Sequence, residues 1–282
     1  MTNILPNNTQ SLLDMILAAQ DDETSPDLVN FLTSRNSAFL RKCLASRDGD
    51  VNDSLRLLSR FITFRTETTK WGYKIQRDDS LQKALLSGVH WVLPGRTKDR
   101  HRVVVFRPKV IGSVVNLPIY EYQRMGALVL EETTSVDNSL VTLLVDVSGI
   151  RLGTLWQFST SDVRQGTCMW MDRYPVKLRR ILIVNASSLV RGFFRTLVAP
   201  LLPSKMAARV LFVDSAKILH ALVPASMLPQ ELKGCDGRLE GFDWKEMVER
   251  ETWAWGGGEK EEGGEEEEEV KRGTSTETVL VL

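Results

Sequence analysis

The sequence predicts an α/β fold in which a small helical unit precedes a domain with a mostly parallel sheet. Up to about residue 70, apolar residues recur at helical spacing. From residue 100 onward, the pattern changes to β-branched apolar runs of strand length with helical patterns between them. Because strands that alternate with helices are joined by crossover connections, the sheet that they form is expected to be mostly parallel.

The N-terminal helices are predicted from apolar stripes and from a helix start signal. Residues 12–17, 39–44 and 53–65 each carry large apolar side chains on one helical face. The segment 25–27, Ser-Pro-Asp, is typical of a helix start, since serine is a favourable cap and proline is tolerated in the first turn. The polar turn 47–50 separates the last two of these helices.

The sheet and its connecting helices are predicted from the alternation that follows residue 100. The strand candidates are rich in valine, isoleucine and leucine, and an unbroken apolar run such as 181–184 suits a strand covered on both faces. The predicted strands are 103–106, 141–147, 181–184 and 210–213, and the predicted helices are 118–131, 155–171, 188–199 and 215–222.

Charge is unevenly distributed along the 282 residues, although the formal net charge is zero. Residues 259–282 contain nine acids and three bases, which leaves 33 bases and 27 acids in residues 1–258. The Gly/Glu-rich segment 256–269 has too little apolar area to offset the entropy of ordering, so we expect it to be disordered. The predicted organisation is a helical region (1–75), an α/β domain (85–240) and an acidic tail (241–282).

The expected setting is cytoplasmic. No apolar run approaches the roughly 20 residues that span a bilayer, so membrane contact is expected to be peripheral. The N-terminal residues lack the apolar region of a secretory signal. The three cysteines, Cys43, Cys168 and Cys235, are scattered and odd in number, which favours a reducing compartment.

Catalytic and metal-binding motifs were sought, and the sequence favours neither function. A nucleophile elbow, a Walker loop and a dinucleotide-binding glycine motif are all missing. His90, His101 and His220 lie in different predicted elements, so we expect no metal site and no cofactor. Asp146 stands at the carboxyl end of a predicted strand, where α/β enzymes place their sites, so an enzyme centred on it is a weaker alternative.

Two basic pairs flank the predicted helix 188–199, which contains Phe193 and Phe194. Lys177 and Arg179 lead into a strand at (i, i+2) spacing, and Lys205 and Arg209 have the (i, i+4) spacing of one helical face. Cations beside an apolar segment favour an anionic membrane or a phosphoinositide head group. Nucleic acid is a weaker candidate because exposed aromatic residues do not alternate with the cations.

Four segments, in a fixed order, carry a family resemblance. They are FLRKCLASRDGDV with LLSRFITFR (39–65), LLVDVSGIRLGTLWQFS (143–159), MDRYPVKLRRILIVNASSLVRGFFRTLVAPLLPSK (171–205) and LVPASMLPQELKG (222–234). In these segments the chain resembles the CRAL-TRIO lipid-binding family, and in particular its alpha-tocopherol transfer protein-like branch. Two departures are Ala127, where the tocopherol protein has a polar cavity position, and Gly234-Cys235, where the family has Gly-Gly.

The resemblance implies an apolar cavity in the α/β domain, closed by an amphipathic gate helix at about 188–201. It also implies a phosphoinositide site formed by basic residues next to the gate. The implied cavity and gate residues are Val141, Val145, Met169, Tyr174, Val176, Ile181, Phe193, Phe194, Leu197 and Val198. The implied head-group residues are Arg47, Lys177, Arg179, Lys205 and Arg209.

The function expected from this resemblance is an intracellular carrier, peripheral on endosomal or other intracellular membranes, that moves a hydrophobic small molecule between membranes. Tocopherol, retinoid, sterol and phospholipid ligands all stay open. The alternative from another class is a ligand-free adaptor at phosphoinositide membranes, with a protein partner bound by the acidic tail. The C-terminal residues 280–282 could also dock on a partner by strand addition.

Overall fold

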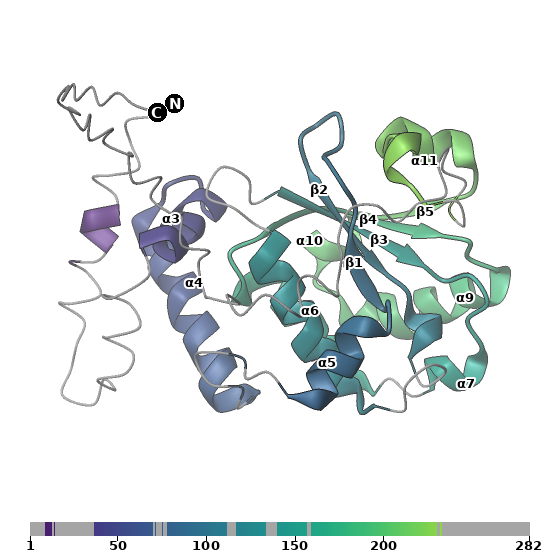
Figure 1. Cartoon of the computed structure of the whole chain (residues 1–282), viewed down its shortest axis with the longest axis horizontal. Helices are drawn as coiled ribbons and strands as arrows, with labels where there is room; N and C mark the ends of the chain where they lie inside the picture. Colours follow the sequence, from purple (N-terminus) through teal and green to yellow (C-terminus); the bar gives the residue numbers. More distant parts are fainter. Residues whose placement is uncertain are drawn as a thin grey trace, which may run out of the picture.

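A five-stranded sheet forms the centre of the structure, with helices on both of its faces (Figure 1). The computed structural model describes residues 9–12, 14, 37–69, 71, 75, 78–111, 117–133, 140–156, 159–229 and 232. The predicted helix start at 25–27 and the predicted acidic tail lie outside these residues. The predicted domain limits remain predictions.

The strands follow one another across the sheet in chain order, and β2 to β5 are parallel. The prediction of a mostly parallel sheet is therefore confirmed. The antiparallel edge strand β1 was not predicted, because its three residues, His-Trp-Val, are too few to show a periodic pattern. The strands are β1 (His90–Val92), β2 (Arg102–Phe106), β3 (Leu140–Asp146), β4 (Lys177–Val184) and β5 (Val210–Val213).

Strand β4 begins earlier than predicted. The basic residues before Ile181 belong to the strand itself, since Lys177 pairs with Leu140 of β3. The pairing then passes from Leu178 to Arg180 on adjacent β3 residues, so Arg179 is an additional residue in a bulge. The side chain of Arg179 is exposed.

Two of the N-terminal helices begin at well-defined N-caps. Asp50 accepts a hydrogen bond of 2.8 Å from the Asp53 amide and so caps the start of α4, and Asp78 caps α5 in the same way. Asp48 and Gly49 have positive φ values in the turn before α4. These elements are α3 (Ser37–Ser46), α4 (Val51–Thr63), the π-helical η1 (Phe64–Thr68) and α5 (Asp79–Leu86).

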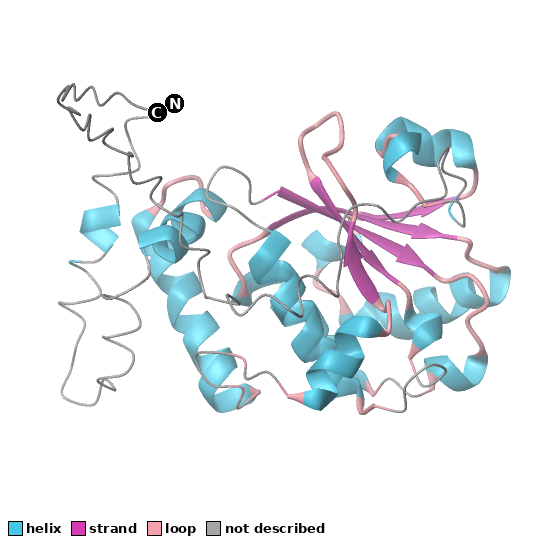
Figure 2. Cartoon of the chain, in the orientation of Figure 1, coloured by secondary structure: helices cyan, strands magenta, loops and turns pink. Residues whose placement is uncertain are grey.

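The helices between the strands match the predicted pattern with one correction (Figure 2). The predicted single helix 155–171 is wrong, because Ser159 and Asp162 form a capping box that starts a new helix. The elements after β2 are η2 (Pro108–Val110), α6 (Ile119–Thr133), α7 (Leu152–Leu155), α8 (Thr160–Cys168), η3 (Met169–Arg173), α9 (Ser188–Phe193), η4 (Phe194–Val198), η5 (Ala199–Leu201), α10 (Ser204–Ala207), α11 (Ala216–Leu222) and η6 (Ala225–Met227).

The core is divided between the two faces of the sheet. On one face, Leu144 and Leu182 pack with Leu219 of α11. On the other face, Leu143 and Ile181 belong to a larger cluster that includes residues of α3, α4 and α6. Within the part of the chain that the structure describes, every helix is too short or too polar to cross a bilayer.

Candidate functional site

A cavity of about 630 Å³ lies between one face of the sheet and the helices that cover it. Its floor consists of side chains from alternate strand positions, which point to the same face. A volume of this size is typical of small-molecule sites, which are commonly about 300–1,000 Å³. The strand residues in the lining are Leu143 and Val145 of β3, Ile181 and Ile183 of β4, and Val210 and Phe212 of β5.

The segment α9–η4 covers one side of this cavity, and we call it the gate segment (188–198). Ser187 caps α9 by accepting a hydrogen bond from the Val190 amide. Phe193, Phe194 and Leu197 line the cavity. The Leu197 side chain is nonetheless 46% exposed, so the segment presents apolar groups both to the cavity and to solvent.

Trp156 extends the exposed apolar surface at the mouth of the cavity. Its side chain is 70% exposed and also lines the cavity. Its ring lies edge-on to Phe193 of the gate segment, with 6.2 Å between centroids. Sequence reasoning missed Trp156, because a single tryptophan in a short turn has no periodic partner.

The predicted cavity residues fall into two groups. The residues in the lining are Val145, Met169, Ile181, Phe193, Phe194, Leu197 and Val198. Val141, Tyr174 and Val176 are buried outside the lining. Val141 shares a face with Val145 but lies nearer the amino end of β3, where Tyr174 and the N-terminal helices fill the space.

Tyr174 instead connects the N-terminal helices to the sheet domain. Its hydroxyl accepts a hydrogen bond of 3.1 Å from Arg65 Nη1, and its ring packs edge-on against Phe61. The same Arg65 nitrogen lies 2.6 Å from a carboxylate oxygen of Glu131 on α6. Because the Arg65 side chain is fully buried, the ion pair and the tyrosine compensate for the loss of water.

Most of the cavity lining is apolar, but it includes His90 of β1 and Gln123 of α6. Burial lowers the pKa of His90 to about 3, and a weaker backbone contact to Val105 opposes this shift. The imidazole is therefore neutral at physiological pH. Its ring stacks on Phe106 with 4.6 Å between centroids.

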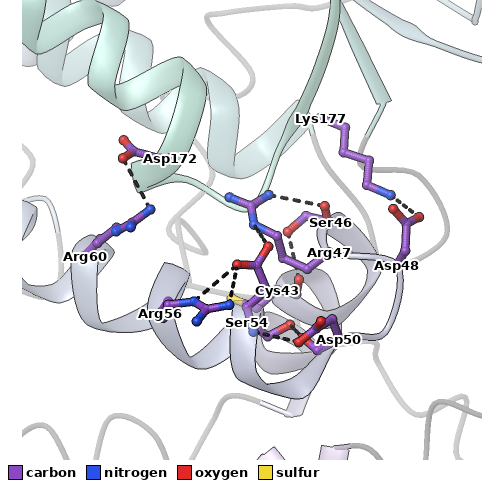
Figure 3. Close-up of polar contacts among 11 residues, drawn as sticks. Cys43, Ser46, Arg47, Asp48, Asp50, Ser54, Arg56, Arg60, Asp172 and Lys177 are labelled. Carbon is purple, nitrogen blue, oxygen red and sulfur yellow. Dashed lines mark hydrogen bonds and ion pairs between the residues drawn. The ribbon is translucent and has the colours of Figure 1, made fainter. Parts of the chain in front are cut away.

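The predicted head-group residues, which we call the basic cluster, are Arg47, Lys177, Arg179, Lys205 and Arg209. Figure 3 shows Lys177 at the start of β4 extending toward Asp48 in the turn before α4, where the two form an ion pair. Arg47 Nε lies 3.7 Å from an Asp53 carboxylate oxygen, and Arg47 Nη1 donates to the Ser46 carbonyl at 3.2 Å. Burial lowers the pKa of Arg47, and the neighbouring Asp53 opposes this shift.

The other three members of the basic cluster lie at or beside the amino ends of β4 and β5. The amide of Ile181 donates to the carbonyl of Arg209 at 2.9 Å, so the Arg209 backbone lies beside β4 at Ile181. Lys205 is exposed on α10, one turn before Arg209. Because β4 and β5 are parallel, cations from distant parts of the sequence lie at the same end of the sheet, where these strands begin.

Asp146, the centre of the enzyme alternative, is engaged in structural hydrogen bonds. Its carboxylate accepts from the Ser148 amide and hydroxyl at 3.0 Å each and from Asn185 Nδ2 at 2.9 Å. Arg107 Nε lies 3.8 Å away. Through Asn185, which follows β4, Asp146 connects the ends of β3 and β4. Within the described ranges, no group of His, Cys, Asp or Glu residues is arranged as a metal site.

Comparison with known proteins identifies relatives over most of the chain. The CRAL/TRIO domain matches residues 86–234. The proteins named Alpha-tocopherol transfer protein-like from Homo sapiens and Pongo abelii are each 27% identical over 248 residues, or 86% of this chain and 68% of the relative. The Mus musculus protein of the same name is 28% identical over 223 residues, or 77% of this chain and 63% of the relative. The crystal structure of Sfh5 aligns at a TM-score of 0.45 and 13% identity, covering 85% of this chain and 90% of that one.

Proposed function

The chain belongs to the CRAL-TRIO family, and on that premise we propose that it binds a hydrophobic small molecule in its cavity and transfers it between membranes. The family includes transfer proteins for lipophilic ligands, and the relatives from three mammals carry the name of such a protein. The observation that carries the proposal is the apolar cavity of about 630 Å³ beneath the gate segment. A catalytic function is not proposed.

The gate segment is suited to exchange between a closed state and a membrane-bound state. In the closed state Phe193 and Phe194 face the cavity, while Leu189 and Leu197 remain about half exposed. When the segment moves outward, its apolar side chains and Trp156 enter the bilayer interface together. The free energy of membrane insertion then offsets the loss of contacts over the ligand, so opening is coupled to the membrane.

The basic cluster is proposed to bind the phosphoinositide head group and to hold the protein on the cytoplasmic face of endosomal or other intracellular membranes. Lysine and arginine side chains that gather near a membrane surface each contribute on the order of 1 kcal/mol to binding an anionic leaflet. To contribute fully, Lys177 exchanges its ion pair with Asp48 for one with a phosphate.

The carrier function is tested by what the protein retains when purified. Organic extraction of the full chain from cells, followed by mass spectrometry, is expected to yield one class of lipid at close to one molecule per chain. A chain that carries no lipid, yet binds phosphoinositide vesicles, would instead favour the adaptor alternative, in which the acidic tail recruits a protein.

The head-group role is tested with two variants of equal charge. We expect Lys177→Ala/Arg179→Ala to weaken binding to vesicles that contain phosphatidylinositol bisphosphate by about tenfold or more, since two cations leave the membrane-facing cluster. The matched control is Lys83→Ala/Lys217→Ala, which removes two exposed lysines from α5 and α11. Equal losses in both variants would mean that only net charge matters.

A further inference from the structure

The turn that joins β1 to β2 concentrates positive charge, and we call residues 96–102 the basic hairpin. Its sequence, RTKDRHR, contains four lysine and arginine residues and one acid, Asp99. That acid is already engaged, since its carboxylate lies 3.2 Å from Arg180 Nη2 of β4. The turn projects beyond the sheet at the top of the view in Figure 1, and Lys98 and Arg100 are exposed. The basic hairpin therefore carries more positive charge than its own acid can balance.

Hydrogen bonds across the turn hold the backbone of the basic hairpin. The Thr97 amide donates to the His101 carbonyl at 2.9 Å, and the His101 amide donates to Thr97 Oγ1 at 3.0 Å. The Arg100 amide donates to the Thr97 carbonyl at 2.8 Å. Arg100 closes the turn with a φ of 62°, a left-handed conformation that is uncommon for a residue other than glycine. The positive side chains therefore extend from a turn with a fixed backbone.

Arg96 and Arg102 lie on either side of this turn, close enough for their charges to interact. Burial lowers the pKa of Arg102, and the positive charge of Arg96 lowers it further. Neither arginine forms an ion pair with another residue that the structure describes. Two like charges at short range without an acid between them repel each other, so an added anion would stabilise this part of the hairpin.

The described part of the chain ends near the base of the basic hairpin. A Cβ atom added at Gly95, the residue before the hairpin, would lie 3.9 Å from Sδ of Met227 in η6. Leu228 and Leu232 then pack in the same cluster as Leu93, which precedes the hairpin. Leu232 is the last residue that the structure describes. Whatever follows it in the sequence is therefore tethered close to the positive charge.

The segment 259–269 of the same chain has the complementary charge. It contains eight glutamates and one lysine, and it begins 27 residues after Leu232. A chain of that length can span up to about 90 Å when extended, so the tether does not prevent contact with the basic hairpin. A tethered partner meets its site at an effective concentration that can reach the order of 1 mM, so even a weak electrostatic contact is populated.

We propose that the acidic segment 259–269 binds the basic hairpin of its own chain through ion pairs with Arg96, Lys98 and Arg102. Charge complementarity and the place where the chain leaves the fold favour this occupant over an anionic membrane. Arg180, which pairs with Asp99 of the hairpin, is next to Arg179 of the basic cluster. The bound segment thus places negative charge beside the head-group site. That consequence rests on the proposed function, whereas the contact itself does not.

Zero-length cross-linking of the full chain tests the contact. A carbodiimide joins a lysine amine directly to a carboxylate that touches it, and mass spectrometry locates the resulting amide. The internal control is Lys83, an exposed lysine of α5. We expect the glutamates of 259–269 to link to Lys98 about fivefold more often than to Lys83, because docking raises their local concentration. Mixing chains of natural and heavy nitrogen isotopes separates links within one chain from links between two copies.

Two variants separate docking from chance contact. Arg96→Gln/Arg102→Gln removes two cations and keeps the reacting amine of Lys98, so the link should fall about threefold or more. The matched control, Arg151→Gln/Arg164→Gln, removes two exposed arginines elsewhere and should keep the link. In the second variant the five glutamates of 265–269 become glutamine, which leaves the folded body unchanged. Links from the remaining glutamates of the segment should fall by a similar factor.

Several results would overturn the inference. They are equal yields at Lys98 and Lys83, links found only between two chains, a dominant link to Lys205 of the basic cluster, and a Lys98 link that persists at full yield in either variant. If no Lys98 link formed and Arg96→Gln/Arg102→Gln weakened vesicle binding, the basic hairpin would be a membrane surface instead. Each of these results leaves the carrier function standing, because lipid extraction tests that function separately.

Discussion

Mostly apolar side chains and the neutral imidazole of His90 line the cavity, whereas Lys177 and Arg47 of the basic cluster are each paired with an aspartate. The cavity is buried, apolar and free of cations among its described lining residues. Two members of the basic cluster lie beside acids: Lys177 pairs with Asp48 of the turn before α4, and Arg47 pairs with Asp53 of α4 (Figure 3).

The difference indicates two kinds of binding. A ligand in the cavity gains mainly from the burial of apolar area, so its binding depends on shape and on apolar contact. A phosphate at the basic cluster replaces bonds that already exist, so its net gain is small and depends on competing charge. Changes that affect one region should therefore leave the other largely unaffected.

The largest expected effect comes from filling the cavity. Gly166 of α8 lines the cavity, and a Cβ atom added there meets nothing within 4 Å. Gly166→Trp should displace about 100–150 Å² of ligand contact, which weakens ligand binding by about 2.5–4 kcal/mol, or roughly 100- to 1,000-fold. Binding is measured by titration with a fluorescent hydrophobic probe. Vesicle binding by the basic cluster should not change.

The control for this change is Gly153→Trp. Gly153 lies on α7 outside the lining, and an added Cβ atom there also meets nothing within 4 Å. It should bind the lipid probe normally. If both variants bound it with the affinity of the unaltered chain, the cavity would not be the ligand site.

The neutral state of His90 predicts a dependence of stability on pH. Burial lowers its pKa to about 3 in the folded chain, against about 6.5 when unfolded. Between these values the unfolded chain holds the proton and the folded chain does not, so the stability that the neutral ring provides falls as pH falls. The free energy of unfolding of the unaltered chain, relative to His90→Phe, should drop by about 2 kcal/mol between about pH 7 and pH 5.

Urea unfolding of both proteins at the two pH values measures this quantity. The other ionisable groups are common to both chains, so the difference isolates His90. Parallel stability profiles would show that the ring is not kept neutral by burial, and the contrast between a neutral cavity and a charged cluster would weaken.

The sheet was largely predictable from sequence, because buried parallel strands are unbroken apolar runs that leave a strong local pattern. The elements that were missed have causes that periodicity does not report. Strand β1 is too short, and the capping box at Ser159 divides a segment whose apolar spacing suits one helix. The early start of β4 depends on pairing with β3, which is a contact between distant residues.

The site was predictable only in part, for the same reason. Val145, Ile181 and Phe194 were predicted from the resemblance, and they lie in the cavity lining, while their contact with a ligand stays a prediction. Tyr174 bonds to Arg65 from more than a hundred residues earlier, and no sequence pattern connects the two. Asp48 was visible as part of a polar turn, but its pairing with Lys177 depends on how the turn packs against β4.

A higher salt concentration should weaken binding at the basic cluster but not in the cavity, and this effect is smaller than those above. Raising the salt concentration from about 0.05 M to about 0.5 M shortens the Debye length about threefold and screens the exposed charges of the basic cluster. Vesicle binding should weaken by about tenfold, whereas binding of the fluorescent hydrophobic probe should change less than about twofold, since burial of apolar area is not screened. Co-sedimentation and fluorescence titration on one protein batch measure both. A similar loss in both assays would mean that charge also governs the cavity.

The smallest expected effect concerns Asp48. Asp48 forms an ion pair with Lys177, and its φ of 57° is a conformation that asparagine tolerates well. Asp48→Asn should therefore keep the turn and release Lys177 for a phosphate. Because exposed ion pairs contribute about 0.2–1 kcal/mol, affinity for phosphatidylinositol bisphosphate vesicles should rise about 1.4- to fivefold.

The matched control for Asp48→Asn is Asp79→Asn, which removes the same charge from exposed α5. A rise in vesicle affinity confined to Asp48→Asn would indicate that the aspartate competes with the head group at Lys177. An equal rise in both variants would reduce the effect to net charge, and a fall in Asp48→Asn would mean that the ion pair holds Lys177 in its binding position. Affinity for the fluorescent hydrophobic probe is measured in parallel, and it should stay unchanged because Asp48 and Lys177 lie outside the cavity lining.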